Sequence, residues 1–326
     1  MKKVLSGMRP TGKMHLGHLF GALNNWVALQ DKYKCFFMVA DWHALMSEYE
    51  NPSQMKDLII EMAADWISVG IDPEKSVIFV QSEIKEHLEL AMIFSDITPL
   101  SWLERCPTYK EQLREIKGKD LTTYGFLGYP VLQASDILIY KAEAVPVGED
   151  QLPHLELTRE IGRRFNHLYK KEVFPEPEAL LTKMPRLLGL DNRKMSKSYN
   201  NFIALSDEPD IIKKKIESMI TDPKRIKRQD AGHPNVCNVF SYYKILSAGK
   251  TEEVKTWCEG AHKGCTECKA LLAQNIVECF APVREKRNKL LKDKNAISDI
   301  LKQGAKKATE VASATMAQVY STIGMK

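Results

Sequence analysis

The first half of the chain alternates short apolar runs with helical patterns, and this alternation limits the fold more than any other feature. The apolar run at 35–40 is typical of a strand buried on both faces, and a further strand is expected at 77–80. Residues 15–33 and 53–69 carry apolar side chains at helical spacing. A further short strand is expected at 3–6. Strands and helices that alternate in this way predict an α/β fold with a doubly wound parallel sheet.

Up to about residue 206 the chain continues to alternate strands and helices, and beyond it the pattern is helical. Residues 101–125 are polar and are expected to be an insertion. An apolar helix over 129–141, a strand over 145–148 and a helix over 151–166 follow. Prolines 175, 177 and 185 indicate a loop-rich connection. From about residue 207 the pattern is helical, so we predict an α/β domain over 1–206 and a helical domain over 207–326.

Composition and charge indicate a water-soluble chain with one basic region. Of 326 residues 44% are hydrophobic, and no apolar run approaches the ~18 residues that span a bilayer. The N-terminus lacks a signal-peptide pattern, so a cytosolic location is expected. Residues 1–206 hold 25 Lys+Arg and 27 Asp+Glu, whereas 207–326 hold 22 and 15. The basic helical region suits a polyanion such as RNA, although a solvated helical surface explains it equally well.

A candidate phosphate site lies at 9–18, between the first predicted strand and the first predicted helix. Ligands of open α/β sheets bind at the carboxyl ends of strands, and helix N-termini favour phosphate. His15 and His18 are three residues apart, so both are expected on one helical face. Gly17 between them would let a flat base approach the backbone. Taken alone, this pattern describes two surface histidines equally well.

A second candidate site is the cationic loop at 193–199, which contains Lys194, Met195, Ser196, Lys197 and Ser198. Two lysines at spacing three would hold a triphosphate and stabilise a departing pyrophosphate, where negative charge builds up. Basic loops are usually only solvated. The pairing of this pentapeptide with the earlier His-x-Gly-His is far more specific than either motif alone.

These two motifs resemble the HIGH and KMSKS signatures of class I aminoacyl-tRNA synthetases, and the second matches in every letter. Within that class, segments 6–12, 134–138 and 145–151 are similar to the tryptophanyl branch, and the resemblance covers essentially the whole chain. It implies a Rossmann-like catalytic domain over 1–206 and an anticodon-binding domain over 207–326. It also implies ATP, Mg²⁺, L-tryptophan and tRNA(Trp) as substrates and partners, and a homodimer, with the 101–125 insertion near its interface or near the tRNA acceptor end.

The resemblance also implies roles for individual residues. ATP would be contacted by Arg9, Pro10, Thr11, Gly17, His18, Gly148, Glu149, Asp150, Leu187, Lys194, Met195, Ser196, Lys197 and Ser198. Catalytic groups would be Lys13, His15, His18, Lys194 and Lys197. The tryptophan pocket would hold Leu5, His43, Tyr129, Gln133, Asp136, Val145, Val147 and Gln151. Arg9, His18 and Gln133 stand where the family often has Gln, Asn and Met.

The role of Asp136 has a physical basis besides the resemblance. The indole N–H is a donor with no acceptor capacity, and a buried carboxylate facing it gains a charge-assisted hydrogen bond. Phenylalanine would leave that carboxylate unpaired, and sites of this kind reject such an analogue by on the order of 10⁴–10⁵. The alternative is a carboxylate on a helix surface, which the apolar neighbours Leu132, Ile137 and Ile139 disfavour.

The expected reaction needs little covalent help from the protein. The tryptophan carboxylate attacks the α-phosphate of ATP, pyrophosphate leaves with Mg²⁺, and the enzyme supplies position and positive charge. A hydroxyl of the terminal adenosine of the tRNA then attacks the mixed anhydride, and resemblance to class I points to the 2′-OH.

Four of the seven cysteines, Cys237, Cys258, Cys265 and Cys268, form a cluster in the sequence. One C-x-x-C pair with two further thiolates suits either Zn²⁺ or a [4Fe–4S] cluster, and the single pair favours iron–sulfur. Some tryptophanyl-tRNA synthetases carry such a cluster with a similar spacing. Lys224, Arg225, Lys227 and Arg228 lie nearby, and with Trp257, His262 and Lys263 they suit an anticodon loop. Four unrelated thiols are the alternative.

Three other functions remain open at this point. Tyrosine activation uses the same fold, and the amino-acid dependence of the reaction would separate it from tryptophan activation. A nucleotidyltransferase outside translation also carries His-x-Gly-His, but the lysine motif disfavours it. An iron–sulfur redox or sensor protein on a synthetase scaffold is disfavoured by the retained Asp136.

Overall fold

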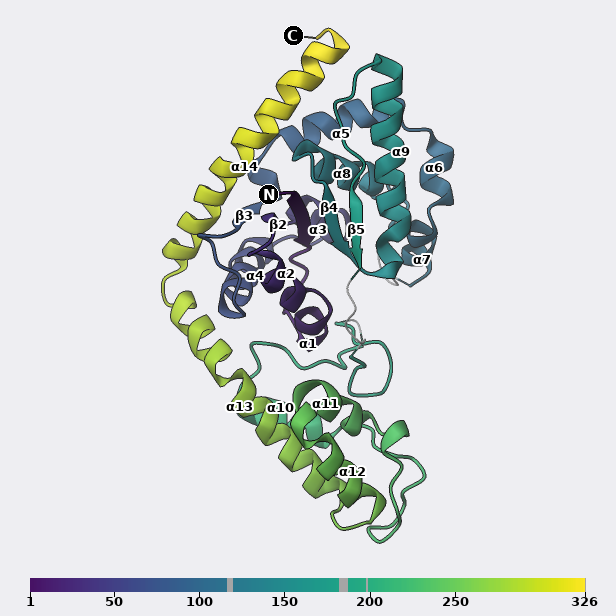
Figure 1. The fold of residues 1–326 in the computed structure, drawn as a ribbon, viewed down its shortest axis with the longest axis vertical. Coiled ribbons are helices and arrows are strands. Elements are labelled where there is room, and N and C mark those ends of the chain that lie inside the picture. The colour runs from purple at the N-terminus through teal and green to yellow at the C-terminus, as the bar shows by residue number, and fades with distance from the viewer. Residues whose placement is uncertain (116–119, 182–186, 198, 326) are drawn as a thin grey trace. The chain divides into compact units, whose positions relative to one another are not determined.

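A computed structural model describes residues 1–115, 120–181, 187–197 and 199–325, and Figure 1 shows its fold. The chain divides into two compact units by its internal contacts. Unit 1 comprises 1–11, 24–183 and 290–326, and unit 2 comprises 12–23 and 184–289. This division departs from the boundary predicted at 206, because the C-terminal helix packs in unit 1 and the His-x-Gly-His segment in unit 2. The assignment of catalysis and anticodon binding to 1–206 and 207–326 stays a prediction.

Unit 1 is built on a five-stranded sheet whose paired strands all run parallel, as the alternating pattern predicts. The strand order is β3-β2-β1-β4-β5. Because β1 lies in the centre and the order reverses there, the carboxyl end of β1 is the topological switch point, where ligands of such sheets bind. The strands are β1 (Lys3–Met8), β2 (Lys34–Val39), β3 (Val77–Val80), β4 (Ala144–Val147) and β5 (Glu178–Leu181).

The strand β5 was not predicted and lies within the predicted loop-rich connection around prolines 175, 177 and 185, whose residues 171–177 are irregular. It pairs with β4 in the register Ala144↔Glu178 to Val147↔Leu181. Its four side chains are exposed or half-buried, so the segment has neither the continuous apolar run nor the regular alternation of a central strand. Pro185 lies outside the described residues.

Helices cover the sheet and form the insertion. The described part of the predicted polar insertion holds α6, α7 and the first residues of α8, with an irregular stretch at 120–123, whereas 116–119 lie outside the described residues. The helices of unit 1 are α2 (Asn24–Leu29), α3 (Asp41–Glu48), α4 (Met55–Ser68), α5 (Glu86–Ile97), α6 (Leu100–Arg105), α7 (Pro107–Glu115), α8 (Tyr124–Ile139), α9 (Leu152–Tyr169) and α14 (Lys294–Ile323).

The apolar helix α8 is the centre of the packing in unit 1. It packs against α5 and α9, and its inner face joins the buried cluster formed with the sheet. Almost all of its side chains from Tyr129 to Ile139 are buried. Any polar group on this stretch of helix therefore sits in an apolar environment, where it must find hydrogen-bond partners.

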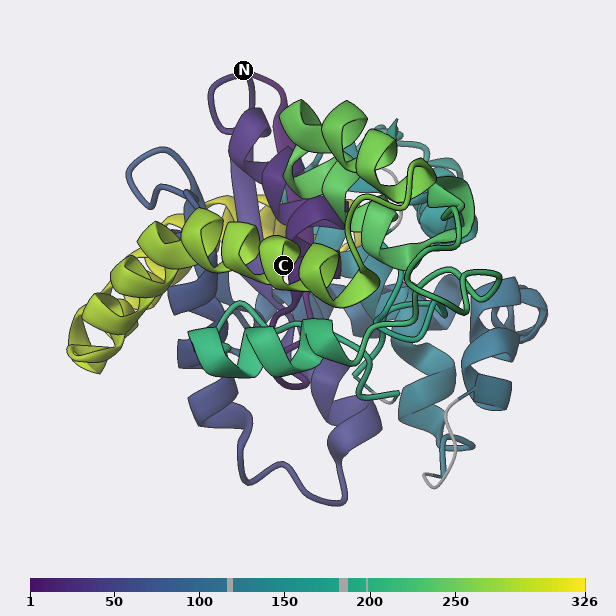
Figure 2. The same cartoon turned by 90° about the horizontal axis from the view of Figure 1, so that it is seen from below.

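The C-terminal helix α14 packs along β3 (Figure 1). Gly304 makes this approach close: a Cβ atom built there would lie 1.8 Å from the carbonyl oxygen of Ile78. The absence of a side chain at this one position therefore lets the helix lie directly on the strand backbone. Figure 2 shows the same chain from below.

Unit 2 consists mostly of helices and irregular loops. The predicted helix over 15–33 is interrupted: α1 (Leu16–His18) is followed by a π-helical turn (Leu19–Leu23), and only then by α2. π-turns occur often at functional sites. The other helices of unit 2 are α10 (Pro209–Glu217), α11 (Asn238–Leu246), α12 (Thr251–Glu259) and α13 (Cys265–Leu291). None of the helices in the described part of the chain is long and apolar enough to cross a membrane.

Candidate active site

In unit 1 the buried carboxylate of Asp136 on α8 is held by three side chains from other elements. His43 Nε2, at the start of α3, lies 2.6 Å from Oδ2. Gln81 Nε2 donates to Oδ1 at 2.7 Å, and His87 Nδ1 lies 2.6 Å from the same oxygen. The other ring nitrogen of His87 lies 2.7 Å from the hydroxyl of Tyr140. Two of the predicted pocket residues, His43 and Asp136, are thus in direct contact.

The environment keeps Asp136 ionised. Its side chain is only 3% exposed, and burial alone would raise the pKa of the carboxyl. The charge of His43 and hydrogen bonds from His43 and His87 outweigh burial and lower the pKa. Asp136 therefore places a buried negative charge on the apolar face of α8, where it can accept a charge-assisted hydrogen bond from an N–H donor.

A second chain of hydrogen bonds joins Tyr129 and Gln151 through His154. The Tyr129 hydroxyl lies 2.8 Å from His154 Nε2, and His154 Nδ1 lies 2.9 Å from Gln151 Oε1. Gln151 Nε2 in turn donates to Asp150 at 3.0 Å. Burial, followed by the charge of His43, lowers the pKa of His154 to about 4. The neutral ring donates from Nδ1 to the amide oxygen, so the Tyr129 hydroxyl donates to Nε2.

The other predicted residues of unit 1 lie on or next to the same sheet. Leu5 and Val145 are buried in the core cluster, and Val147 packs against it. Gln133 is half-buried on α8. Arg9, Pro10 and Thr11 follow the carboxyl end of β1, and Gly148, Glu149 and Asp150 follow that of β4. These two strands are neighbours in the sheet, so both segments lie at one edge of it.

In unit 2 the His-x-Gly-His segment is paired with the strand-like stretch that follows the lysine motif. Leu16 N–H donates to Ile203 O at 3.0 Å, and Leu205 N–H donates to Met14 O at 2.9 Å. Lys197 Nζ donates to Gly12 O at 3.0 Å. The two motifs, about 180 residues apart in the chain, are therefore neighbours, as their predicted joint action on a polyphosphate requires.

The two histidines have distinct positions. His15 is the N-cap of α1, and its backbone N–H donates to His18 Nδ1 at 3.1 Å. Burial, followed by the charge of Lys197, lowers the pKa of His15 to about 4, and burial lowers that of His18 well below its ordinary value. A neutral His18 that accepts at Nδ1 carries its proton on Nε2, which is then a donor for phosphate. His15 Nδ1 is buried and has no partner among the described residues.

Gly17 lies against the lysine motif. Its N–H donates to Met195 Sδ at 3.2 Å, and a Cβ atom there would meet the His15 ring at 3.0 Å. The missing side chain thus makes room for Met195 and His15 in the structure. Its predicted use as a platform for a flat base stays a prediction.

Asn201 holds the described part of the lysine motif. Its amide oxygen accepts from Ser196 N–H at 2.8 Å, and its amide nitrogen donates to Asp191 at 2.7 Å and to Lys194 O at 3.1 Å. Met195 is buried and Lys194 is exposed. Leu187 is buried as well. Ser198, predicted to contact ATP, lies outside the described residues.

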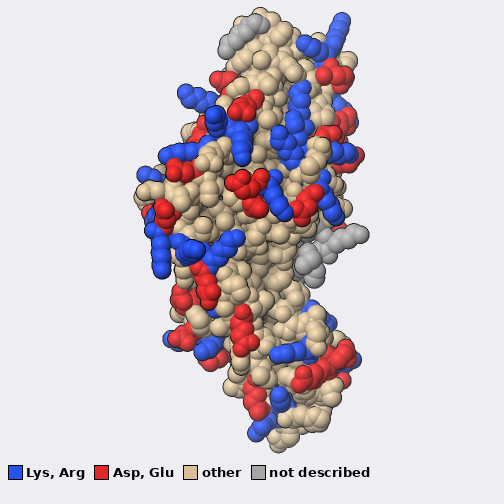
Figure 3. Space-filling view, turned by 60° about the vertical axis from the view of Figure 1, so that its left-hand side comes forward, with Lys and Arg blue, Asp and Glu red and all other residues tan. Residues whose placement is uncertain are grey.

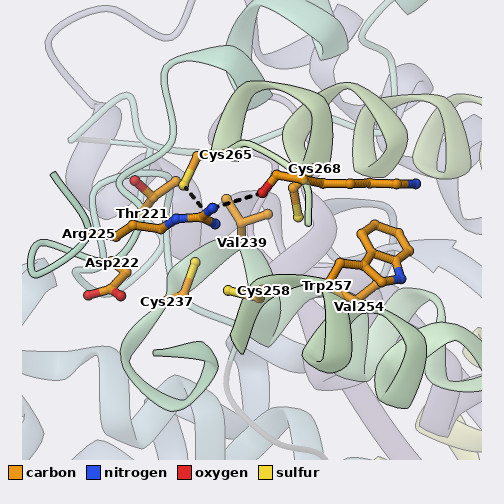
Figure 4. A pocket seen from close by; sticks show the side chains of 11 residues that line it. Thr221, Asp222, Arg225, Cys237, Val239, Val254, Trp257, Cys258, Cys265 and Cys268 are labelled. Carbon is orange, nitrogen blue, oxygen red and sulfur yellow. Dashed lines mark hydrogen bonds between the residues drawn. The ribbon is translucent and has the colours of Figure 1, made fainter. Parts of the chain in front are cut away.

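The four clustered cysteines line one pocket of unit 2, of about 390 Å³ (Figure 4). Cys237 precedes α11, Cys258 lies in α12, and Cys265 and Cys268 lie in the first turn of α13. All four are free thiols. Arg225 lines the same pocket: it lies 4.0 Å from Cys265 Sγ and donates to Lys263 O at 2.9 Å. In the described part of the chain, no group of three or more His, Cys, Asp or Glu is arranged to hold a metal ion.

Comparison with known proteins identifies the family. Residues 1–281 match the family model described as "tRNA synthetases class I (W and Y)". The tryptophan–tRNA ligase of Thermotoga maritima is 53% identical over 99% of both chains. The chain belongs to the class I tryptophanyl-tRNA synthetases. The Aquifex aeolicus tryptophan–tRNA ligase is 42% identical over 99% of this chain and all of its own.

Solved structures agree with this identification. The Campylobacter jejuni tryptophanyl-tRNA synthetase, in a complex with ADP and tryptophan, has a TM-score of 0.91 and 35% identity, with 99% of each chain covered. The Rossmann-like α/β fold with a helical C-terminal region is confirmed. The synthetase is a tryptophan–tRNA ligase, which decides against tyrosine activation, a nucleotidyltransferase outside translation, and a redox or sensor protein.

Several residues of the site were not identified from the sequence. Gln81 directly follows β3. Ligands bind at the carboxyl ends of parallel strands, so this position in the sequence indicates a site residue. His87 and His154 lie in helices and carry no motif. Asn201 lies just beyond the lysine motif. Their partners are distant in sequence or set by loop geometry, so only the folded chain shows their contacts.

Proposed function

We propose that Asp136 selects tryptophan in this synthetase and that the two motif segments of unit 2 activate it with ATP. The buried, ionised carboxylate on α8 carries the first part of the proposal, because it is a charge-assisted acceptor for the indole N–H. His43, Tyr129 and Gln151 line the amino-acid site. The Campylobacter jejuni relative was solved with ADP and tryptophan, which supports both substrates here.

Adenylate formation is an in-line displacement. An oxygen of the tryptophan carboxylate forms a bond to the α-phosphorus of ATP while the bond from that phosphorus to the bridging oxygen of the β-phosphate breaks, so pyrophosphate leaves with the electron pair. Lys194 and Lys197 stabilise the charge that develops on the departing group. Mg²⁺ bound with the nucleotide supplies further neutralisation of the phosphates.

The histidines of the first motif act as hydrogen-bond donors and not as proton acceptors. Because His15 and His18 are neutral at neutral pH, they add no charge to a site that already holds lysines. Each neutral ring supplies one N–H to a phosphate oxygen, and Lys13 adds a further cation. The remaining ATP contacts proposed from the motifs are Arg9 to Thr11, Gly17, Gly148 to Asp150, Leu187 and Met195 to Ser198.

In the second step the 2′-OH of the terminal adenosine of tRNA(Trp) attacks the carbonyl carbon of the adenylate. An ester bond to tryptophan forms, and AMP leaves. We propose the helical region as the tRNA-binding part, with Lys224, Arg225, Lys227 and Arg228 near the anticodon. On the face shown in Figure 3, Lys and Arg are interspersed with Asp and Glu, so a local group of cations is proposed and not a general positive field.

A [4Fe–4S] cluster is proposed at the four-cysteine pocket, with Zn²⁺ as the alternative. The donor set fits: four free thiols line one pocket, and the Arg225 cation beside them offsets thiolate charge. Tetrahedral zinc draws four sulfurs to about 2.3 Å from one ion, whereas a cluster spreads them over its corners. The single C-x-x-C pair with two further thiolates favours the cluster. When bound, it would cross-link α11, α12 and α13.

We further propose a homodimer in the cytoplasm, where tryptophan, ATP and tRNA meet. The exposed apolar side chains of Leu88 and Met92 on α5 and Leu100 on α6 are consistent with a subunit interface in unit 1.

ATP–pyrophosphate exchange tests the activation step. Purified protein is assayed with tryptophan, tyrosine, phenylalanine and no amino acid. Exchange with tryptophan alone is expected. Exchange with phenylalanine at a comparable rate would overturn the proposed role of Asp136, because a carboxylate facing the ring should reject a side chain without a donor.

A further inference from the structure

The three hydrogen bonds to Asp136 are distributed unequally over its two oxygens. Oδ1 receives Gln81 Nε2 and His87 Nδ1, at 2.7 and 2.6 Å. Among the described residues, His43 alone contacts Oδ2, at 2.6 Å. An ionised carboxylate offers about four acceptor positions, two on each oxygen. Oδ1 is therefore saturated, and Oδ2 keeps one vacant position.

We propose that Gln81 and His87 are positioning residues that determine specificity, because they saturate Oδ1 and leave a single acceptor position on Oδ2 for the indole N–H. The inference rests on the proposed role of Asp136 and adds to it. Without these donors, the carboxylate could rotate about its terminal torsion and present either oxygen at several angles.

Both residues are fully buried, and their geometry fits this role. Neither Gln81 nor His87 has measurable exposure. Since the ionised carboxylate only accepts, Nδ1 of His87 must carry a proton in either charge state of the ring. Tyr140 contacts the opposite nitrogen, and the backbone carbonyl of His87 accepts from Ser135 at 2.6 Å. The imidazole is thus held at both ring nitrogens, by Asp136 and by Tyr140.

The two donors come from different elements. Gln81 directly follows β3, and His87 lies in the first turn of α5, whereas Asp136 is on α8. Three elements that pack in the core therefore meet at one carboxylate. Gln81 Oε1 is buried and has no partner among the described residues, so the hydrogen bond that the Gln81 amide makes there is the one to Asp136.

Two substitutions of His87 separate positioning from packing. His87→Leu removes both ring nitrogens, whereas His87→Asn keeps an amide N–H near the position of Nδ1. Two compounds are compared: tryptophan, and an analogue with sulfur in place of the indole N–H. The KM for tryptophan and for ATP are measured by pyrophosphate exchange, and the analogue is measured by its inhibition constant.

We expect His87→Leu to raise the KM for tryptophan roughly 10- to 100-fold, as expected for a weakened bond to a charged acceptor. The KM for ATP and the inhibition constant of the analogue should change less than about threefold, and His87→Asn should recover most of the loss. An equal loss for tryptophan and the analogue would assign His87 a merely structural role. An unchanged KM for tryptophan would overturn the inference as well.

Tyr140→Phe is the milder variant if His87→Leu does not fold. It removes only the hydroxyl that contacts His87 Nε2. A smaller effect in the same direction is expected, again confined to tryptophan. Asp136→Asn is the reference. If it leaves the preference for tryptophan over the analogue intact, the proposed role of Asp136 itself fails; if it abolishes that preference and the His87 variants do not, only the present inference fails.

Discussion

His43 Nε2 lies 2.6 Å from Asp136 Oδ2, and this contact joins the N-terminal end of α3 to the middle of α8. The histidine shares the oxygen that we propose for the indole N–H. It therefore closes one side of the acceptor and limits the directions from which a substrate donor can approach. In our proposal, recognition of tryptophan depends on the charge and the orientation of this one carboxylate.

Asp136→Asn is expected to raise the KM for tryptophan by on the order of 100-fold or more. The change removes the charge and places amide hydrogens opposite donors from His43, Gln81 or His87. Pyrophosphate exchange over a range of tryptophan concentrations measures it. Asp96→Asn, an exposed carboxylate on α5, is the matched control. A wild-type KM in Asp136→Asn would contradict the proposal.

Lys197→Ala is expected to lower kcat for pyrophosphate exchange by on the order of 10²–10³, because a cation at the departing pyrophosphate acts mainly in the transition state. The affinity for tryptophan should stay within about twofold, since the proposed amino-acid site is built from residues of unit 1. Lys213→Ala on α10, an exposed lysine of the same unit, serves as the control. Should kcat remain at the wild-type level, the proposed clamp is wrong.

Gly304→Ala is expected to destabilise unit 1 by about 1–3 kcal/mol, as overpacking of a tight contact does. The added methyl would lie 1.8 Å from the Ile78 carbonyl oxygen, so α14 must move away from β3. Gly125→Ala on α8 meets nothing within 4 Å and should be neutral or stabilise by up to about 1 kcal/mol. Denaturant titration of both variants measures the difference, and equal stabilities would refute the packing argument.

The burial of His154 predicts a loss of stability in mild acid. Its pKa in the folded protein is about 4, below the value of 6.5 for an exposed histidine. Between these values the unfolded chain binds more protons, so the free energy of unfolding falls as the pH drops from 6.5 towards 4.

The variant His154→Asn should reduce this fall by about 1–3 kcal/mol. Urea unfolding at pH 7 and pH 4.5 tests the expectation, with His167→Asn, an exposed residue of α9, as the control. Identical pH dependence in His154→Asn and wild type would show that His154 is not the group responsible.

Cys268→Ser is expected to abolish the visible absorbance of an iron–sulfur cluster in protein purified without oxygen, and to weaken charging of tRNA(Trp) more than pyrophosphate exchange. Cys279→Ser on the exposed side of α13 should leave both unchanged, because this thiol is not in the pocket. Stoichiometric zinc with no iron would select the alternative metal. Full tRNA charging by a cluster-free Cys265→Ser variant would contradict a role of the cluster in tRNA binding.

Some features were predictable because they are local. The parallel sheet followed from apolar runs alternating with helical spacing, and β3 was predicted with its observed bounds. Short motifs marked the two segments that we propose to bind phosphate, and the apolar neighbours of Asp136 indicated its burial. The edge strand β5 was missed because it lacks a periodic apolar pattern. The π-turn after α1 was missed because its apolar residues have the spacing of an ordinary helix.

The sequence by itself determined the α/β class, the two synthetase motifs and the grouping of four cysteines, since each is written in adjacent residues or short spacings. Only the tertiary structure decided which groups surround Asp136, because Gln81 and His87 lie 55 and 49 residues away from it in the chain. It also decided that α14, which the sequence grouped with the preceding helices, packs along β3 in unit 1. Burial and hydrogen-bond partners depend on which distant segments pack together, and local spacing carries no information about that choice.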